Sequence, residues 1–191
     1  MPERQTGGRE PAPGGLALLQ AFVNTEWNLD SVHEDRFATP QDVSDWLAAR
    51  ALLELGIRLV DGDLERVRDV RRGLRELLFA NNGATPDQEI IRRLNEALTG
   101  ASVFARLDPT APPDFTTVRR DLNGALGILA TLTALAQLDG RWPRLKACRG
   151  VKCGWTFYDH SRNGSATWCS MSVCGSRAKA REYRRRKKSE A

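Results

Sequence analysis

Four cysteines lie in the last quarter of the 191-residue chain and form two pairs with the same internal spacing. Cys148 and Cys153 have four residues between them, fifteen residues follow, and Cys169 and Cys174 again have four residues between them. Tetrahedral coordination of Zn²⁺ needs thiolate ligands from two separate places in the chain. The two cysteine pairs, with this spacing, provide such ligands. Four sulfur ligands leave no open position for water or substrate, so the sequence predicts one structural zinc ion rather than a catalytic one.

Two alternatives use the same cysteines. They could form two disulfides, as in small secreted domains, or remain thiols with no shared role. We favour metal because the cysteines are clustered and because residues 1–15 contain no apolar run like that of a secretory signal. His160 lies between the two pairs and would allow a Cys₃His site, but with four cysteines available we expect it to be an exposed turn residue.

The residues between the two cysteine pairs predict a β-hairpin. Trp155, Phe157 and Trp168 favour strands, and Asn163-Gly164 favours a tight turn between them. Alternation along a strand would place Trp155 and Phe157 on one face and Tyr158 on the other. These aromatic side chains could stack on nucleobases or form a small core beneath the metal, and we favour the core.

A strongly basic run follows the last cysteine. Residues 177–188 contain eight lysines and arginines and one acid, and the first half consists of good helix formers. Because the run follows Cys174-Gly175 directly, it would be the final helix of a treble-clef-like finger, and its cations could neutralise nucleic-acid phosphates. The alternative is a solubilising, frayed tail. The predicted nucleic-acid-binding residues are Arg177, Lys179, Arg181, Arg184, Arg185, Arg186 and Lys187, and Lys146, Arg149, Lys152 and Arg162 could extend the basic surface.

The net charge of +5 conceals a division along the chain. From Arg141 onward there are 14 lysines and arginines and three acids, whereas the preceding residues hold 15 lysines and arginines and 21 acids. A basic module on a mildly acidic body favours a polyanionic partner such as nucleic acid. The most apolar stretch, residues 124–138, is too short to span a bilayer, so we expect no membrane partner. The need for reduced thiols favours a cytoplasmic location.

No constellation of residues indicates catalysis. The two histidines, His33 and His160, lie in no pattern typical of a nucleophilic site, and His33 is expected on the surface of a polar loop. The carboxylates of the N-terminal part lie among arginines, as they do on solvated helix faces. We therefore expect a protein that is not an enzyme.

The rest of the chain predicts a mainly α body in front of the metal module. Residues 1–15 predict a disordered leader, and the stretch between the first helix and Ala38 is expected to be irregular. Residues 102–108 and 115–118 could form a short hairpin. The predicted domains are 16–140 and 141–191, with a linker so short that the two pack together. Helical spacing and end signals predict five helices: from Leu16 to Asn24-Thr25, from the cap Thr39 to Leu55-Gly56, over 64–79 after a cap at 61–63, from Thr85-Pro86-Asp87 to Gly100, and over 122–138.

Several motifs of the C-terminal module resemble the CGNR zinc finger, a family named for its final Cys-Gly-Asn-Arg. The four cysteines match the metal ligands of that family one for one. Ser176 stands where the family has asparagine, and serine can still cap the helix that follows. The similar segments are Arg144-Leu145-Lys146, Cys153-Gly154-Trp155, Phe157-Tyr158-Asp159, Trp168-Cys169-Ser170-Met171 and Cys174-Gly175-Ser176-Arg177.

In that family the finger follows a helical region called the ABATE domain, which is described as a stress-induced transcription regulator. Phe22-Val23-Asn24-Thr25 and Trp46-Leu47 resemble its opening motifs. The resemblance implies regulation of transcription through DNA binding by the finger. Asn24 and Thr25 could line a ligand pocket, or they could cap the first helix and hydrogen-bond across the bundle, which we favour.

A second hypothesis belongs to a different class. The helical domain could sense a small-molecule effector or bind a protein effector, with the zinc module serving only as a structural cap. RNA binding is a variant of the first hypothesis, favoured if Tyr158 or a tryptophan stacks on bases.

Overall fold

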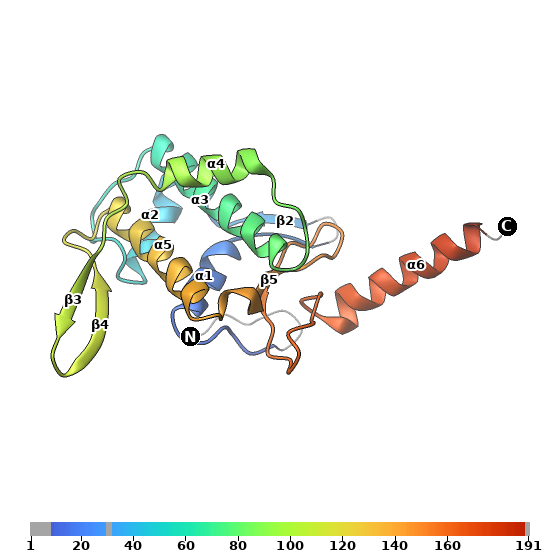
Figure 1. Ribbon diagram of the computed structural model, residues 1–191. Helices are drawn as coiled ribbons and strands as arrows, with labels where there is room; N and C mark the ends of the chain where they lie inside the picture. The colour runs from blue at the N-terminus through green and yellow to red at the C-terminus, as the bar shows by residue number, and fades with distance from the viewer. Residues whose placement is uncertain (1–8, 30–31, 190–191) are drawn as a thin grey trace.

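The computed structural model describes residues 9–29 and 32–189. Within them, six α-helices and three two-stranded antiparallel sheets form a helical body and a C-terminal module, and the last helix projects away from both (Figure 1). The body contains α1 (Leu16–Val23), β1 (Glu26–Leu29), β2 (Val32–Asp35), α2 (Pro40–Ala48), α3 (Asp61–Ala80), α4 (Gln88–Ala97), β3 (Phe104–Asp108), β4 (Ala111–Thr116) and α5 (Leu122–Leu138). The module contains the 3₁₀ turn η2 (Trp142–Arg144), β5 (Leu145–Ala147), β6 (Thr156–Tyr158), the π-helical turn η3 (Met171–Gly175) and α6 (Ser176–Ser189).

The core of the body lies where α1, α3 and α5 meet. Phe22, Leu78 and Leu126, one from each helix, are fully buried because the apolar side of each helix faces the other two. Burial of one such side chain contributes about 2 kcal/mol. α2 covers this core, and Trp46 meets the ring of Phe22 edge-on with 5.7 Å between the centroids. Among the described helices, none is both long and apolar enough to cross a bilayer.

Local sequence signals predicted some helix ends correctly and others wrongly. α5 has the predicted bounds, and α2 begins at the predicted cap Thr39, which forms a capping box with Asp42. α2 was expected to reach Leu55-Gly56 but ends at Ala48, because Ala51 turns to φ 57° and the Leu52 N–H bonds back to the Leu47 carbonyl. α4 is capped by the Asp87 carboxylate rather than opened by Thr85, so it begins at Gln88.

The stretch before Ala38 was expected to be irregular, but it forms a β-hairpin, so that expectation was wrong. β1 and β2 pair antiparallel, with Trp27 opposite Glu34. Contacts with α3 hold this hairpin. The Arg71 guanidinium, almost fully buried, makes two hydrogen bonds of 2.6 and 2.8 Å to the Asp35 carboxylate, and Arg75 pairs with Glu26 at 2.7 Å. These ion pairs join residues far apart in sequence, so no local pattern reveals them.

The second hairpin of the body, β3 with β4, was predicted, but its second strand covers Ala111–Thr116 rather than residues 115–118. Its strands pair antiparallel with an irregularity between Arg106 and Asp108, and every residue of β3 is exposed. The hairpin projects from the body on the side away from α6 (Figure 1).

The prediction of a disordered leader over residues 1–15 was wrong for its second half. Residues 1–8 lie outside the described residues. Beyond them, Ala12 is buried and its N–H bonds to the Gln20 side chain at 2.8 Å. Arg9 reaches the metal module, where its guanidinium donates to the carbonyls of Cys169 and Trp168 at 2.7 and 2.9 Å. Residues 9–12 therefore pack against the body and the metal module.

The hairpin of the module is not the predicted one. β6 pairs with β5, which precedes the first cysteine pair, rather than with the segment around Trp168. Asn163-Gly164 does lie in a turn, closed by the Gly164 N–H on the Ser161 carbonyl, but this turn joins no paired strands. The first cysteine pair therefore occupies the connection of the β5–β6 hairpin.

Candidate metal centre

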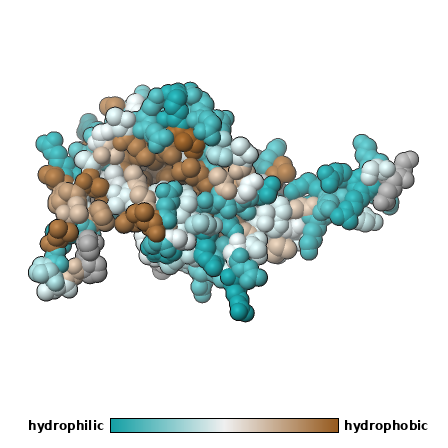
Figure 2. All heavy atoms as spheres, in the orientation of Figure 1, coloured by the Kyte–Doolittle hydropathy of each residue, from teal (hydrophilic) through white to brown (hydrophobic). Residues whose placement is uncertain are grey.

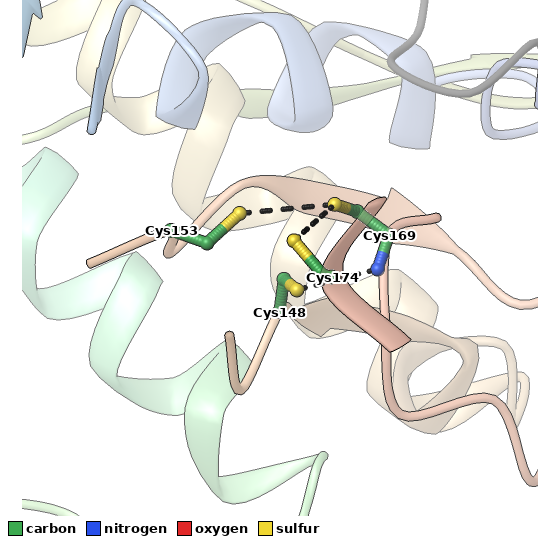
Figure 3. Close-up of side chains that lie close together, drawn as sticks. All are labelled: Cys148, Cys153, Cys169 and Cys174. Carbon is green, nitrogen blue, oxygen red and sulfur yellow. Dashed lines mark hydrogen bonds between the residues drawn. The ribbon is translucent and has the colours of Figure 1, made fainter. Parts of the chain in front are cut away.

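The four cysteine sulfurs converge on one point (Figure 3). All lie within 4.8 Å of one another, and Cys169 Sγ is 3.7 Å from both Cys153 Sγ and Cys174 Sγ. A zinc ion with four Zn–S bonds of about 2.3 Å requires sulfurs about 3.8 Å apart, whereas a disulfide requires about 2.05 Å. The separations therefore fit a tetrahedral metal site and exclude disulfides in this arrangement. Among the described residues, no histidine or carboxylate joins the cluster.

The four thiols also affect the protonation of one another. Hydrogen bonds from the thiols of Cys153 and Cys169, together with backbone N–H groups, lower the pKa of Cys148 to about 2. The hydrogen bond with Cys148 raises the pKa of Cys153 to about 12 and also raises the pKa of Cys169, while burial raises the pKa of Cys174. Four thiolates so close together repel one another, and a divalent cation removes that conflict because it favours the thiolate at every ligand.

Two tight turns present the sulfurs. In the first, the Cys153 N–H bonds to the Gly150 carbonyl at 2.9 Å, and a Cβ on Gly150 would lie 3.0 Å from Cys174 Sγ. Glycine at this position therefore lets the first turn pack closely against the second cysteine pair. In the second turn, the Ser170 hydroxyl accepts the Val173 N–H and so caps η3, which continues into α6. The Ser176 hydroxyl donates to the Met171 carbonyl at 3.1 Å, one turn before α6.

A buried carboxylate outside the cysteine cluster also stabilises the module. Asp159 is fully buried, and its side chain accepts hydrogen bonds from Lys146 Nζ at 2.9 Å, from the Ser161 N–H and hydroxyl, and from the Ala166 N–H. Burial raises the pKa of Asp159, but the bonds from Ser161 and Lys146 outweigh it and bring that pKa to about 2. Lys146 is consequently buried, and its predicted place on a basic surface was wrong.

Asn24 ties the module to the body. Its amide donates to the Thr156 carbonyl at 2.9 Å and its carbonyl oxygen accepts the Thr156 N–H at 2.8 Å, so it pairs with β6 as a neighbouring strand would. Thr25 donates to the Phe22 carbonyl at 2.7 Å and accepts from Arg71 at 3.1 Å. Asn24 and Thr25 are both buried. The hydrogen bonds above satisfy the polar groups of both side chains, so no ligand is needed to explain these residues.

Two asparagines directly after α3 make a second connection between the body and the module, which sequence reasoning missed. The Asn81 amide donates to the carbonyls of Trp142 and Leu145 at 2.8 and 2.9 Å. The Asn82 amide donates to the carbonyls of Ala147 and Thr167 at 2.8 and 2.9 Å. In sequence, Asn81-Asn82-Gly83 resembles an ordinary helix stop. The only sign of a further role is that two asparagines stand next to each other there. The metal module and the body are therefore packed together, as the short linker predicted.

The aromatic residues of the module belong to cores, as favoured. Phe157 is buried beneath the cysteines, with Trp155 and Trp168 partly buried beside it. Tyr158 lies on the opposite side of β6 and joins the core of the body. His160 is exposed and takes no part in the metal cluster. Its ring meets that of Tyr158 edge-on, with centroids 4.8 Å apart. His33 is also exposed and contacts Glu26 at 3.2 Å.

All the predicted nucleic-acid-binding residues lie on α6, where every side chain is accessible and none is buried. Figure 2 shows this helix as an almost wholly hydrophilic arm. Arg177, Arg181, Arg184 and Lys188 recur at i, i+4, i+7 and i+11 and therefore share one face. Arg185 flanks that face, whereas Lys179, Arg186 and Lys187 point elsewhere, and Arg186 pairs with Glu182. Of the proposed extension, Arg149, Lys152 and Arg162 are exposed.

Comparison with known families agrees with this architecture. The sequence model of the ABATE family, described as "Putative stress-induced transcription regulator", matches residues 16–145 and thus more than half of the chain. The model of the CGNR zinc finger matches residues 144–187, which include all four cysteines. Among curated proteins, no match is found. The chain therefore belongs to the ABATE family, and its four-cysteine module is a CGNR zinc finger.

Proposed function

We propose that this protein is a regulator of transcription that binds duplex DNA through α6, with one zinc ion fixing the base of that helix. The observation that carries the proposal is a cationic helix, exposed on all sides, that starts at the four-cysteine cluster. The family description supports regulation of transcription. The helical body would receive the effector, and a reducing compartment such as the cytoplasm would keep the thiols able to bind zinc. The proposal includes no catalytic step.

The exposure of α6 needs a physical reason. Helices of 14 residues are marginal in water, and eight cations within α6 repel one another. A polyanion would relieve that repulsion, whereas a protein partner would require an apolar stripe that the helix lacks. Tyr183, 68% exposed, is its one large apolar side chain. Charge thus favours nucleic acid over a protein groove.

The dimensions of α6 suit a DNA groove. The basic face that carries Arg177, Arg181, Arg184 and Lys188 extends about 16 Å along the axis at 1.5 Å per residue. The major groove of B-form DNA is about 12 Å wide and admits one α-helix. In A-form RNA the corresponding groove is deep and narrow, so this face favours duplex DNA over duplex RNA.

The test is fluorescence anisotropy with a short labelled DNA duplex over a series of salt concentrations. We expect the triple variant Arg177→Gln/Arg181→Gln/Arg184→Gln to lower the slope of log K against log salt by about 2.7, because each lost phosphate contact removes about 0.9. The matched control is Lys179→Gln/Arg186→Gln/Lys187→Gln, which removes the same charge from other faces and should change the slope less.

Three outcomes would contradict the proposal. One is the absence of DNA binding by zinc-loaded protein at low salt. Another is an equal effect of the two triple variants, which would indicate a diffuse cationic tail. The third is preferential binding of single-stranded RNA, which would show that the partner is RNA and not duplex DNA.

A further inference from the structure

The turn between the first two cysteines contains an unusual backbone position. The Cys153 N–H bonds to the Gly150 carbonyl, so residues 150–153 form a turn, and Lys152, its third residue, has φ 59°. Turns with positive φ at this position favour glycine or asparagine, because a β-carbon costs about 1–2 kcal/mol there. Strained positions of this kind cluster at functional sites, so the lysine calls for a functional explanation.

The side chains of this turn face solvent. Arg149 and Lys152 are both exposed, and in the described part of the chain neither side chain makes a hydrogen bond or an ion pair. Val151, between them, is 67% exposed. The turn therefore presents two cations that the fold itself does not use.

The turn is also fixed relative to α6. Cys148 and Cys153 bring both its ends to the same sulfur cluster as Cys174, which lies two residues before α6. Gly150 packs against Cys174 so closely that a Cβ would lie 3.0 Å from the sulfur. The two cations of the turn and the first cations of α6 thus project from one rigid base.

We propose that the turn of residues 149–152 is a second contact arm for the DNA backbone, with Arg149 and Lys152 each neutralising one phosphate beside the groove that α6 enters. This inference rests on the proposed function of α6. Phosphates are the appropriate ligands because the arm offers positive charge and no buried polar group that could read a base. Contacts of this kind fix the register of a helix on the duplex and carry no sequence information.

The deciding experiment compares Arg149→Gln/Lys152→Asn with the wild type on a short labelled DNA duplex over a salt series. Asparagine tolerates positive φ, so the turn and the bound zinc should be retained, as zinc analysis and the unfolding midpoint would verify. We expect the slope of log K against log salt to fall by about 1.8, that is about 0.9 for each of the two phosphates. The variant Lys152→Arg, which keeps the charge, should bind as the wild type does.

The matched control is Arg119→Gln/Arg120→Gln. These arginines are exposed and directly precede α5, and the variant removes the same charge. The start of α5 lies on the side of the body away from α6 (Figure 1). A wild-type slope for the turn variant, or an equal loss for the control, would overturn the second arm while leaving α6 as the DNA-binding element. Failure of the wild type to bind any DNA would instead overturn the proposed function itself. If the double variant loses zinc, Lys152→Asn alone decides, with an expected fall in slope of about 0.9.

Discussion

Asp159 shows how a single residue supports the metal module without touching the metal. It accepts four hydrogen bonds, one of them from the buried ammonium of Lys146, and so holds the segment 159–166 against β5. Its position between the cysteine pairs gave no sign of this role in the sequence, because its partners come from both sides of the hairpin. When only one partner of such a buried ion pair is removed, the other charge stays buried without a counter-charge, and the folded protein loses stability.

We predict that Asp159→Asn destabilises the module by about 3 kcal/mol at neutral pH, because Lys146 would stay buried without a counter-charge. Urea unfolding of the zinc-loaded protein measures this change. The control is Asp108→Asn, which alters a similar carboxylate that is bonded to Thr110 but exposed. An equal and small effect of both substitutions would contradict the role of Asp159.

The same carboxylate gives an expected pH dependence. The pKa of Asp159 in the folded protein is about 2, below its ordinary value of 3.8. The stabilisation is therefore complete above about pH 4 and is lost as the pH falls towards about 2. The stability difference between the wild type and Asp159→Asn should shrink over that range, and a difference that grows on acidification would contradict the assignment.

At the scale of elements, sequence prediction succeeded where a signal is local. α5 was predicted with its bounds from a continuous apolar run, and the structure adds a cap from the Asp121 side chain. It failed where an element depends on a distant partner. β1 and β2 depend on Arg71 and Arg75 of α3. β6 pairs with β5 across the cysteine turn rather than with the segment around Trp168. A two-residue period indicates a strand but does not identify its neighbour.

Asn24 gives the prediction at this scale. Asn24→Ala would leave the buried Thr156 N–H without its partner, at a cost of about 1–3 kcal/mol. The Thr156 carbonyl would lose one hydrogen bond but keep the one from the Gln20 side chain at 3.2 Å. We expect zinc to be retained but the Thr156 amide to exchange with solvent faster, as hydrogen exchange would measure. Asn95→Ala is the control, since that amide lies on the exposed surface of α4. Unchanged exchange at Thr156 would show that Asn24 does not hold the module.

At the scale of the whole molecule, the sequence specified the metal site and the basic helix but not how they join the body. The four ligands could be assigned because covalent spacing alone brings each pair together. The module is attached to the rest of the chain by side-chain hydrogen bonds of Asn24, Asn81, Asn82 and Arg9. The partners of these residues lie between 61 and 160 residues away in the chain. These contacts form only in the folded chain, so α6 takes its direction from the body as well as from the metal.

The central claim is that one zinc ion, held by four thiolates, fixes the base of α6. Its most direct test is the metal content of reduced, purified protein, measured together with the amide spectrum of residues 145–189 before and after strong chelation. We predict one zinc per chain, four thiols that become reactive when zinc is removed, and loss of the dispersed signals of the module. Protein without stoichiometric metal whose module keeps its spectrum under chelation would contradict the account.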